Sequence, residues 1–281
     1  MVYMTDEAIE RLLKEDVPYI DLTSLILGIN EQQGLMRFTC REQAVIAGTE
    51  VAQRLLAKLG AETITRVVSG TEVKAGDVFL AAAGPAKGLQ MAWKVCQNIL
   101  EYSSGIATRT RRLVEHGRSV SPRVQIVTTR KIFPGTKELA INAVIAGGGF
   151  PHRLGLSETV LIFAQHLNFT GGIDGLLAMM TEIRARAREK KIIVEVADLE
   201  QALRLCQAGV DGLQFDKVPP AKLSEMVAAI RAVHPTVTLI GTGGINEQNV
   251  AAYAQTGVDV ISTTWVYFGK PVDMGVSITP A

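Results

Sequence analysis

The chain has 281 residues, of which 47% are hydrophobic and 20% charged, and its formal net charge is +1. This length and composition predict a sizeable buried core in one large domain or two ordinary ones. A charge so close to zero argues against general binding to nucleic acid or to a membrane surface. We find no signal peptide and no uncharged apolar stretch that could span a bilayer, and the three scattered cysteines indicate reduced thiols, so we expect a cytoplasmic protein.

The N-terminal part of the chain predicts a small α+β domain. Apolar spacing indicates helices over residues 5–15 and 49–59, and strand material over 35–47. Glycines and alternating apolar residues over 69–84 indicate a β-hairpin. A long helical stretch follows at about residues 88–117.

The remainder alternates between strand and helix. Six short apolar runs are expected to be strands, at residues 124–127, 160–163, 192–196, 212–215, 237–240 and 258–261. Helices are expected after the first five, at residues 137–146, 174–188, 198–208, 220–233 and 246–256. This alternation predicts parallel strands with right-handed crossovers. Because six strands are fewer than the eight of a closed barrel, we expect an open, incomplete β/α barrel; a doubly wound sheet is the alternative that periodicity leaves open.

Cationic residues follow the first of these strands and a later glycine run. Arg130 and Lys131 combine a planar fork of donors with a point charge, which suits a carboxylate or a phosphate. His152 and Arg153 follow three glycines at 147–149, where the backbone can approach a ligand closely. The alternatives are a solvated cationic pair on a loop and a flexible turn after a helix.

Two acidic residues belong to neighbouring expected strands. Glu195 lies inside an apolar strand, where an unpaired carboxylate is costly to bury. Asp216 closes the next strand, so the two side chains are expected side by side. Such a pair suits one Mg²⁺ that also contacts a pyrophosphate. The alternative is a structural ion pair of Glu195 with Arg130 or Lys131.

A glycine turn at 241–246 joins a strand to an expected helix. Its backbone N–H groups and the helix N-terminus predict an anion site, to which hydroxyls after the last strand would add. A plain tight turn is the alternative, but two such loops in succession favour phosphate. The candidate phosphate ligands are Thr242, Gly243, Gly244, Ser262, Thr263 and Thr264.

Taken together, these motifs resemble the quinolinate phosphoribosyltransferase (nicotinate-nucleotide pyrophosphorylase) family, nearly end to end. The segments that carry the resemblance include Glu15-Asp16-Val17-Pro18, Ser104-Gly105-Ile106-Ala107-Thr108, Thr129-Arg130-Lys131, His152-Arg153, Val194-Glu195-Val196 and Gly243-Gly244-Ile245. The resemblance implies an α/β protein with an N-terminal α+β sandwich domain at 1–115 and an open β/α barrel at 116–269. The C-terminal tail at 270–281 would pack back on the first domain.

The resemblance also implies a reaction, the transfer of phosphoribose from phosphoribosyl pyrophosphate (PRPP) to a heteroaromatic acid with Mg²⁺ and release of pyrophosphate. Arg130, Lys131, His152 and Arg153 would bind the acid and the pyrophosphate. Glu195 and Asp216 would bind the ribose hydroxyls and the metal, with Lys131 as a third catalytic residue, while the glycine turn would bind the 5′-phosphate. Subunits of the family share active sites in homodimers or larger homo-oligomers, and Lys94 stands where the arginine supplied by the partner is usual.

Some positions depart from the usual family pattern. Phe163 replaces a lysine expected to bind a carboxylate of quinolinate, Lys217 replaces an asparagine, and Thr264 replaces a glycine. These changes resemble the ModD branch, pyrophosphorylases found with molybdate-transport genes. Losing a cation from the acceptor pocket should weaken dicarboxylate binding.

Three functions therefore stay open. The first is phosphoribosyl transfer with an altered acceptor pocket. The second is a non-catalytic protein that binds a phosphorylated ligand or an oxyanion in molybdenum metabolism. The third is quinolinate phosphoribosyl transfer itself, as in NAD biosynthesis, despite Phe163.

Overall fold

The computed structural model describes residues 2–281, which form two compact units. The first unit comprises the described part of Met1–Arg111 together with Ile132–Gly148 and Tyr267–Ala281. The second comprises Arg112–Lys131 and Gly149–Val266. The fold is therefore an α/β arrangement of the expected kind, but Ile132–Gly148, assigned above to the barrel, groups with the first unit.

Helix α5 (Lys137–Ala146) explains that difference. Ala143 of this helix is buried with Val45 and Ala107 of the first unit. Asn142 also accepts a hydrogen bond from the backbone N–H of Val2 and donates one to the carbonyl of the same residue, at 2.5 and 2.9 Å. These contacts depend on residues distant in the chain, so helical periodicity alone does not reveal them.

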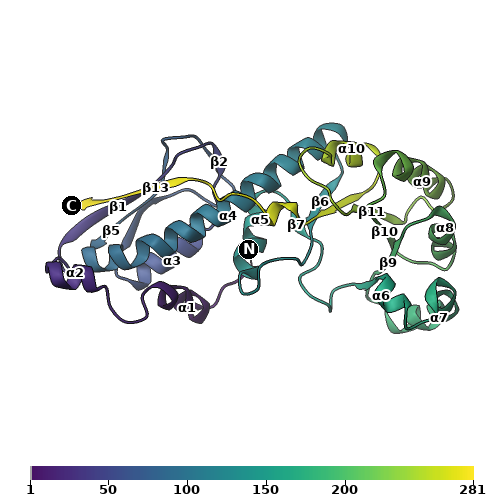
Figure 1. Cartoon of the computed structure of the whole chain (residues 1–281), viewed down its shortest axis with the longest axis horizontal. Helices are drawn as coiled ribbons and strands as arrows, with labels where there is room; N and C mark the ends of the chain where they lie inside the picture. Colours follow the sequence, from purple (N-terminus) through teal and green to yellow (C-terminus); the bar gives the residue numbers. More distant parts are fainter. Residues whose placement is uncertain (1) are drawn as a thin grey trace. The chain divides into compact units, whose positions relative to one another are not determined.

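The first unit is a sheet covered by helices (Figure 1). The antiparallel sheet has the order β13-β1-β5-β3, formed by Met274–Pro280, Gln33–Cys40, Val78–Pro85 and Glu62–Arg66. Along β1 every second residue is buried, so Met36 and Phe38 face the core. They meet Leu55 of α3 (Thr49–Lys58) and apolar residues of α4 (Ala86–Val120). This α+β sandwich buries the apolar faces of both layers.

Several short elements of the first unit differ from expectation. The predicted hairpin at 69–84 is wrong, because β4 (Glu72–Val73) pairs with β2 (Ala44–Val45) while β5 pairs with β1 and β3. Helix α1 (Asp6–Asp16) is confirmed, with Thr5 accepting the N-cap hydrogen bond from Ala8. Helix α2 (Leu22–Leu27), between the Asp21 cap and a left-handed Gly28, was not predicted.

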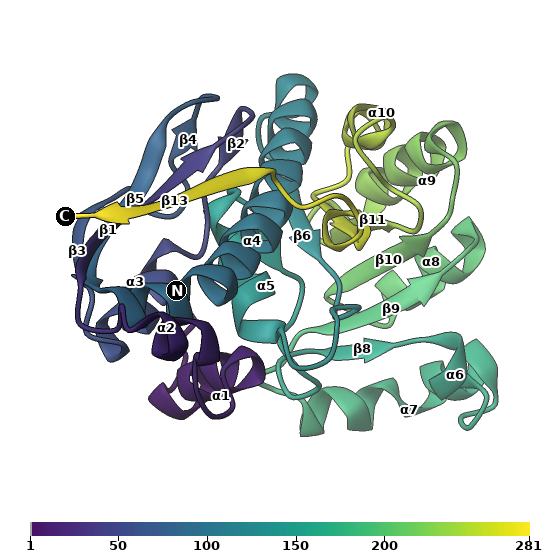
Figure 2. The ribbon, with the colours of Figure 1, turned by 60° about the vertical axis from the view of Figure 1, so that its left-hand side comes forward.

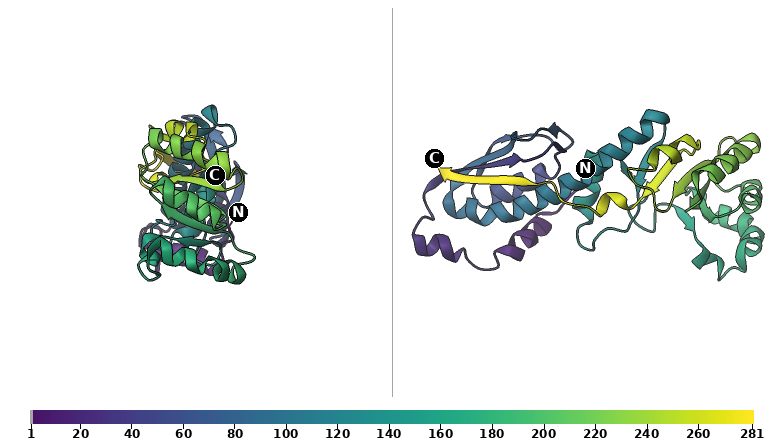
Figure 3. Two further views of the ribbon diagram at one scale, coloured as in Figure 1. Left: turned by 90° about the vertical axis from the view of Figure 1, so that its right-hand side faces the viewer. Right: turned by 45° about the horizontal axis from the view of Figure 1, so that its top comes forward.

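The chain returns to the first unit at its C-terminal end. Strand β13 lies beside β1 in antiparallel register, with Phe38 opposite Val276. Figure 3 shows β13 in yellow along the edge of this sheet. No strand was predicted here, because β13 is an edge strand with an irregular burial pattern.

The second unit contains a curled parallel sheet with the order β7-β6-β12-β11-β10-β9-β8 (Figure 2). These strands are Phe150–Pro151, Gln125–Thr128, Val260–Thr263, Thr238–Thr242, Gly212–Asp216, Ile192–Val196 and Val160–Ile162. From β8 to β12 each new strand adds on the same side, and β6 and β7 continue beyond β12. Strands β7 and β8 do not pair with each other, so the sheet is an open half-barrel. The doubly wound alternative is wrong, because in such a sheet the direction in which strands are added reverses partway through the chain.

Helices cover the outer face of this half-barrel. Figure 2 shows α8, α9 and α10 along one side of β9–β11. The helices of the second unit after α4 are α6 (Ala164–Leu167), α7 (Gly172–Arg186), α8 (Leu199–Gln207), α9 (Pro220–Val233) and α10 (Val250–Gln255).

Helix α10 begins four residues later than expected. Asn249 accepts a hydrogen bond from the N–H of Asn246, and Asn246 accepts one from the N–H of Gln248. Asparagine side chains compete in this way with helical backbone bonds, so the segment after the glycine turn folds as local turns. The glycine turn thus does not run directly into a helix N-terminus.

Between residues 2 and 281, no helix is long and apolar enough to cross a membrane. Cys40, Cys96 and Cys206 are all free and buried, as expected for core thiols.

Candidate active site

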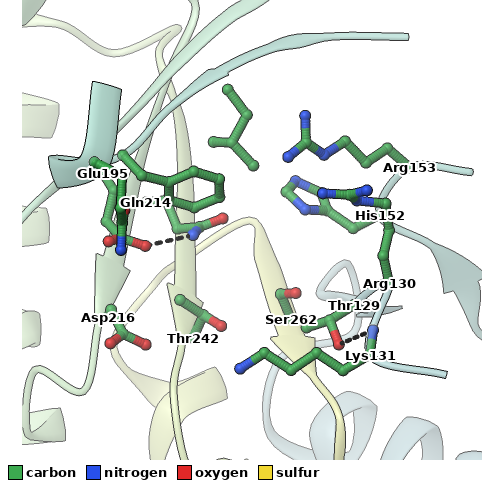
Figure 4. A pocket seen from close by; sticks show the side chains of 13 residues that line it. Thr129, Arg130, Lys131, His152, Arg153, Glu195, Gln214, Asp216, Thr242 and Ser262 are labelled. Atoms are coloured by element: carbon green, nitrogen blue, oxygen red, sulfur yellow. Dashed lines mark hydrogen bonds between the residues drawn. The ribbon is translucent and has the colours of Figure 1, made fainter. Parts of the chain in front are cut away.

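A cavity of about 430 Å³ opens at the carboxyl ends of the parallel strands of the second unit (Figure 4). All of its lining residues belong to this unit. They are Thr129, Arg130, Lys131, His152, Arg153, Leu161, Phe163, Gln165, Glu195, Gln214, Asp216, Thr242 and Ser262.

One wall carries the acidic residues. Glu195 of β9 lies opposite Gln214 of β10 in the parallel register. Asp216 lies two residues beyond Gln214 on the same strand, and so faces the same side. The Nε2 of Gln214 donates a hydrogen bond of 2.9 Å to Oε2 of Glu195, drawn as a dashed line in Figure 4. Both acids were predicted from the sequence, whereas Gln214 was not.

Burial makes the Glu195 carboxylate unfavourable. Desolvation raises the pKa of Glu195 above its ordinary value; the nearby Asp216 also raises it, while the Gln214 hydrogen bond and the charge of Lys131 lower it. The structural ion pair considered for Glu195 is not formed with any described residue, since its hydrogen-bond partner is the neutral Gln214. A half-buried acid held by an amide keeps capacity for a cation or for ligand hydroxyls.

The opposite wall carries the cations, which Figure 4 shows across the cavity from Glu195. Arg130 and Lys131 are exposed on the loop after β6. Strand β7 positions the other two: it pairs with β6, and the N–H of His152 donates to the carbonyl of Thr128 at 2.9 Å. The two-residue β7 thereby brings His152 and Arg153 beside the loop after β6.

Arg153 is the buried cation of the cavity, with 7% of its surface exposed. Burial and the neighbouring charge of Arg130 both lower its pKa from the usual value, and Glu158 partly offsets them. None of the described residues forms an ion pair or a hydrogen bond with its guanidinium in the structure. A buried charge without a partner is costly, so the site favours an anion at this position.

His152 has an unsatisfied polar atom. Its Nε2 is buried and makes no hydrogen bond within the part of the chain that the structure describes. Burial and the charge of Arg153 lower the pKa of His152, which favours the neutral imidazole. Buried polar atoms are usually satisfied, so a free ring nitrogen in a cavity indicates a place for a ligand atom.

Phe163 places an aromatic ring among these polar groups. The residue directly precedes α6, and its N–H donates to Nδ1 of His166 at 3.1 Å. The two rings stack with centroids 5.9 Å apart and an interplanar angle of 20°. The Cζ of Arg153 lies 5.9 Å from the Phe163 ring centroid, within cation–π range.

The glycine turn has strict steric limits. Gly243 has φ +89°, and a Cβ there would come within 2.4 Å of Oδ1 of Asp216 and 2.7 Å of the backbone nitrogen of Lys217. That nitrogen donates to the carbonyl of Thr242 at 2.8 Å, which ties the end of β10 to that of β11. Lys217 itself has φ 57°, the one positive value outside glycine among residues 2–281. The close packing holds Thr242 against the cavity.

The predicted phosphate residues separate into two groups. Thr242 and Ser262 line the cavity, whereas Gly243, Gly244, Thr263 and Thr264 are not among its lining residues. The hydroxyl of Thr263 donates to the carbonyl of Ile245 at 2.6 Å and accepts from the N–H of Trp265. The hydroxyls of Thr264 and Thr129 lie 2.8 Å apart. These bonds hold the loops in place.

Lys94 lies on α4 in the first unit and does not line the cavity. Its Nζ donates to Oε1 of Gln97 at 3.1 Å and lies 4.0 Å from the Trp93 ring centroid. It was predicted to act in the site of a partner subunit, which stays a prediction.

Two of the residues that sequence reasoning missed could have been found from their spacing. Gln214 and Leu161 each lie two positions before a predicted site residue, Asp216 and Phe163, and two-residue spacing places side chains on the same face of a strand. Gln165 follows Phe163 on α6 and carried no comparable signal.

Glu195 and Asp216 are the two acids that line the cavity. No group of three or more potential ligands among histidine, cysteine and acidic residues is present between residues 2 and 281. Two carboxylates do not form a closed protein cage, but they match the needs of Mg²⁺, which usually keeps several waters and takes one or two carboxylates with substrate phosphates.

The open β/α half-barrel and a strand-end cavity with opposed acids and cations define a barrel enzyme site for an anionic substrate. Comparison with protein families identifies it further. Residues 106–277 match the family model "Quinolinate phosphoribosyl transferase, C-terminal domain", and residues 21–104 match the corresponding N-terminal domain. The chain belongs to the quinolinate phosphoribosyltransferase family. Phosphoribosyl transfer is the reaction of this family, and the protein is accordingly an enzyme of the pentosyltransferase class.

Individual relatives match most of the length of the chain. A Rhodobacter capsulatus protein named "Putative pyrophosphorylase ModD" is 39% identical over 257 residues, covering 92% of this chain and 98% of its own. The nicotinate-nucleotide pyrophosphorylase (carboxylating) of Mycobacterium leprae is 33% identical over 262 residues, covering 91% and 90%. The solved nicotinate-nucleotide pyrophosphorylase of Francisella tularensis has a TM-score of 0.89 at 25% identity, covering 99% and 98%. The chain is thus similar to both the ModD and the carboxylating proteins.

Proposed function

We propose that the protein transfers phosphoribose from PRPP to a heteroaromatic acid and releases pyrophosphate. The observation that carries this proposal is the opposition of acids and cations across one cavity, with Glu195 and Asp216 facing Lys131 and Arg153 (Figure 4). A reaction that separates a cationic sugar from an anionic diphosphate needs both signs of charge, placed apart. Family membership supports the choice of donor.

We assign roles to the residues from their positions in the cavity. Arg130 and Lys131 are exposed on one loop and suit the pyrophosphate, which stays partly solvated. Thr242 and Ser262 present hydroxyls at neighbouring strand ends for the 5′-phosphate. Glu195, with its partner Gln214, suits the ribose hydroxyls.

A magnesium ion fits the same scheme. Glu195 and Asp216 would hold it together with the diphosphate of PRPP, and the metal would neutralise part of the charge of the leaving group. Its charge would also keep Glu195 ionised despite the burial that raises its pKa.

The chemical step is a substitution at the anomeric carbon. The acceptor nitrogen gives its lone pair to C1 of the ribose while the bond from C1 to the pyrophosphate oxygen breaks, and pyrophosphate leaves with that electron pair. Positive charge develops on the ribose as in an oxocarbenium ion. The carboxylates on one side and the cations on the other stabilise this charge separation, so the site needs no covalent nucleophile.

The test is calorimetric binding of PRPP with Mg²⁺, followed by titration of quinolinate into that complex. PRPP should bind with Mg²⁺ and should lose binding when the metal is chelated. Glu195→Ala and Asp216→Ala should abolish pyrophosphate release while circular dichroism stays unchanged. Failure of PRPP to bind, or full activity in both variants, contradicts the proposal and favours a non-catalytic binding protein.

A further inference from the structure

The acceptor side of the cavity contains an unusual combination of groups. Arg153 is buried and forms no ion pair with a described residue, although the charge of Glu158 acts on it. Phe163 presents an aromatic ring next to it. Leu161, also buried, lines the cavity two residues before Phe163 on the adjoining strand. This corner of the cavity, formed by Arg153, Leu161 and Phe163, therefore offers one buried cation beside apolar surface.

The number of cations in this corner determines how many ligand carboxylates can be paired there. Arg153 can take one carboxylate through its planar fork of donors. His152, next to it, is held toward its neutral form by burial and by the charge of Arg153, which both lower its pKa. Arg130 and Lys131 are exposed on the loop after β6, where the proposed function uses them for pyrophosphate. A second buried carboxylate would have no cation of its own and would carry a desolvation cost.

The shape of the corner favours a flat ring. Phe163 is fixed by its stacking on His166 and by its backbone hydrogen bond to the same side chain. A fixed aromatic face binds a planar ring at little entropic cost. The buried Nε2 of His152 lacks a partner, and a polar atom on such a ring could supply one.

We infer that the acceptor is a planar aromatic monocarboxylate, bound with its carboxylate on Arg153 and its ring against Phe163. The inference rests on the proposed function, since it names the acceptor class of the same site. This acceptor specificity differs from that of an enzyme selective for an aromatic dicarboxylate. It also requires a charged acceptor, because an uncharged amide would leave Arg153 unpaired.

The experiment measures acceptor binding by calorimetry with Mg²⁺ and pyrophosphate but without PRPP, so that Arg130 and Lys131 are occupied and no turnover occurs. The probes are pyridine-3-carboxylate, benzoate, pyridine-2,3-dicarboxylate and the uncharged pyridine-3-carboxamide. At least one monocarboxylate should bind about tenfold more tightly than both the dicarboxylate and the amide, since each of those leaves a buried charge unpaired. The inference is overturned if the dicarboxylate or the amide binds as tightly as the best monocarboxylate, or if neither monocarboxylate binds.

Variants assign the effect to the two named side chains. Arg153→Gln should weaken monocarboxylate binding about tenfold or more. Arg123→Gln removes an exposed arginine of the same unit outside the cavity and should leave binding unchanged. Phe163→Lys should improve dicarboxylate binding, whereas Phe163→Leu, which keeps an apolar side chain, should not. Equal effects of Arg153→Gln and Arg123→Gln would overturn the assignment.

The two proposals fail in different ways. PRPP binding with Mg²⁺ and pyrophosphate release are measured on the same preparation. If PRPP binds and the monocarboxylates do not, the acceptor inference fails while the transferase proposal stands. If the monocarboxylates bind selectively and PRPP does not, the transferase proposal fails while the specificity of the corner stands.

Discussion

Glu195 is the residue at which stability and function conflict. It lies in a strand whose other members are all buried apolar residues, and its partner is an amide and not a cation. Burial raises its pKa, so the folded chain holds the carboxylate at a cost. Such costs are typical of active sites, where a charge is kept for a ligand.

Replacing Glu195 should therefore stabilise the protein and inactivate it. Because the pKa of Glu195 is higher in the folded than in the unfolded chain, the free energy of unfolding falls as pH rises from about 4.5 through the raised value. Glu195→Gln removes this fall and should raise the melting temperature at pH 7, while kcat/KM drops about a hundredfold or more.

Melting curves over a pH series, with pyrophosphate release at pH 7, check this expectation. Glu189→Gln, which neutralises an exposed acid of the same unit, is the matched control and should change neither quantity. Parallel pH profiles of the parent protein and Glu195→Gln would contradict the stated role of burial.

Gly243 is limited by sterics and not by charge. Gly243→Ala places a Cβ against Asp216 and Lys217, and φ +89° disfavours any side chain. We expect a loss of about 1–3 kcal/mol in the free energy of unfolding, from strain and overpacking, together with weaker PRPP binding.

Gly244→Ala provides the comparison in a urea unfolding experiment. Gly244 has φ +71°, but no atom lies within 4 Å of the position that a Cβ would take, so only the conformational cost of about 1 kcal/mol applies. An equal loss in both variants would show that the contact with Asp216 is unimportant.

At the level of elements, β13 completes the sheet of the first unit. Met274 is 1% exposed, and the strand pairs with β1 over seven residues, Met274 to Pro280. Deleting residues 274–281 should lower the free energy of unfolding by about 3 kcal/mol or more, because it empties a core position and leaves β1 as an open edge.

Removal of only Pro280 and Ala281, both exposed, is the control and should cost little. Urea unfolding and light scattering measure stability and aggregation together. A full deletion as stable and as monodisperse as the control would mean that β13 adds no stability.

Apart from the seven-residue edge strand β13, the elements that pattern reasoning missed are short. Strand β7 has two residues and α2 has six, too few to show a hydrophobic period. Yet β7 positions Arg153, which the proposed chemistry needs. Long elements with a clear period were predicted well, as with α9, whose predicted range of 220–233 agrees with the structure.

At the level of the whole molecule, the cavity lining comes from one unit, while Lys94 belongs to the other. The family resemblance implies that each subunit supplies this residue to the active site of its partner. If they do, Lys94→Ala and Glu195→Ala subunits should each be inactive alone and should complement each other on mixing. A random mixture of dimers then regains about a quarter of the parent activity, since half of the dimers carry one intact site of two.

Pyrophosphate release after mixing and refolding the two variants measures this complementation. Tagging one of the two variants and following the mixed dimers by native mass spectrometry shows whether subunits exchange under the same conditions. Exchange without recovery would contradict a shared site.

The sequence by itself determined the α/β class and most of the chemical groups, because strand periodicity and the polar residues at strand ends are local signals. It favoured the open barrel, but the strand order of the structure excluded the doubly wound sheet. Arg130, His152, Arg153, Glu195 and Asp216 were all predicted in this way, and all line one cavity. Only the tertiary structure decided which groups face one another. The Glu195–Gln214 pair, the turn-forming role of Thr263, and the placement of α5 in the first unit depend on strand register and on packing between distant residues. Such contacts form between residues that are far apart in the sequence, so the local pattern does not predict them.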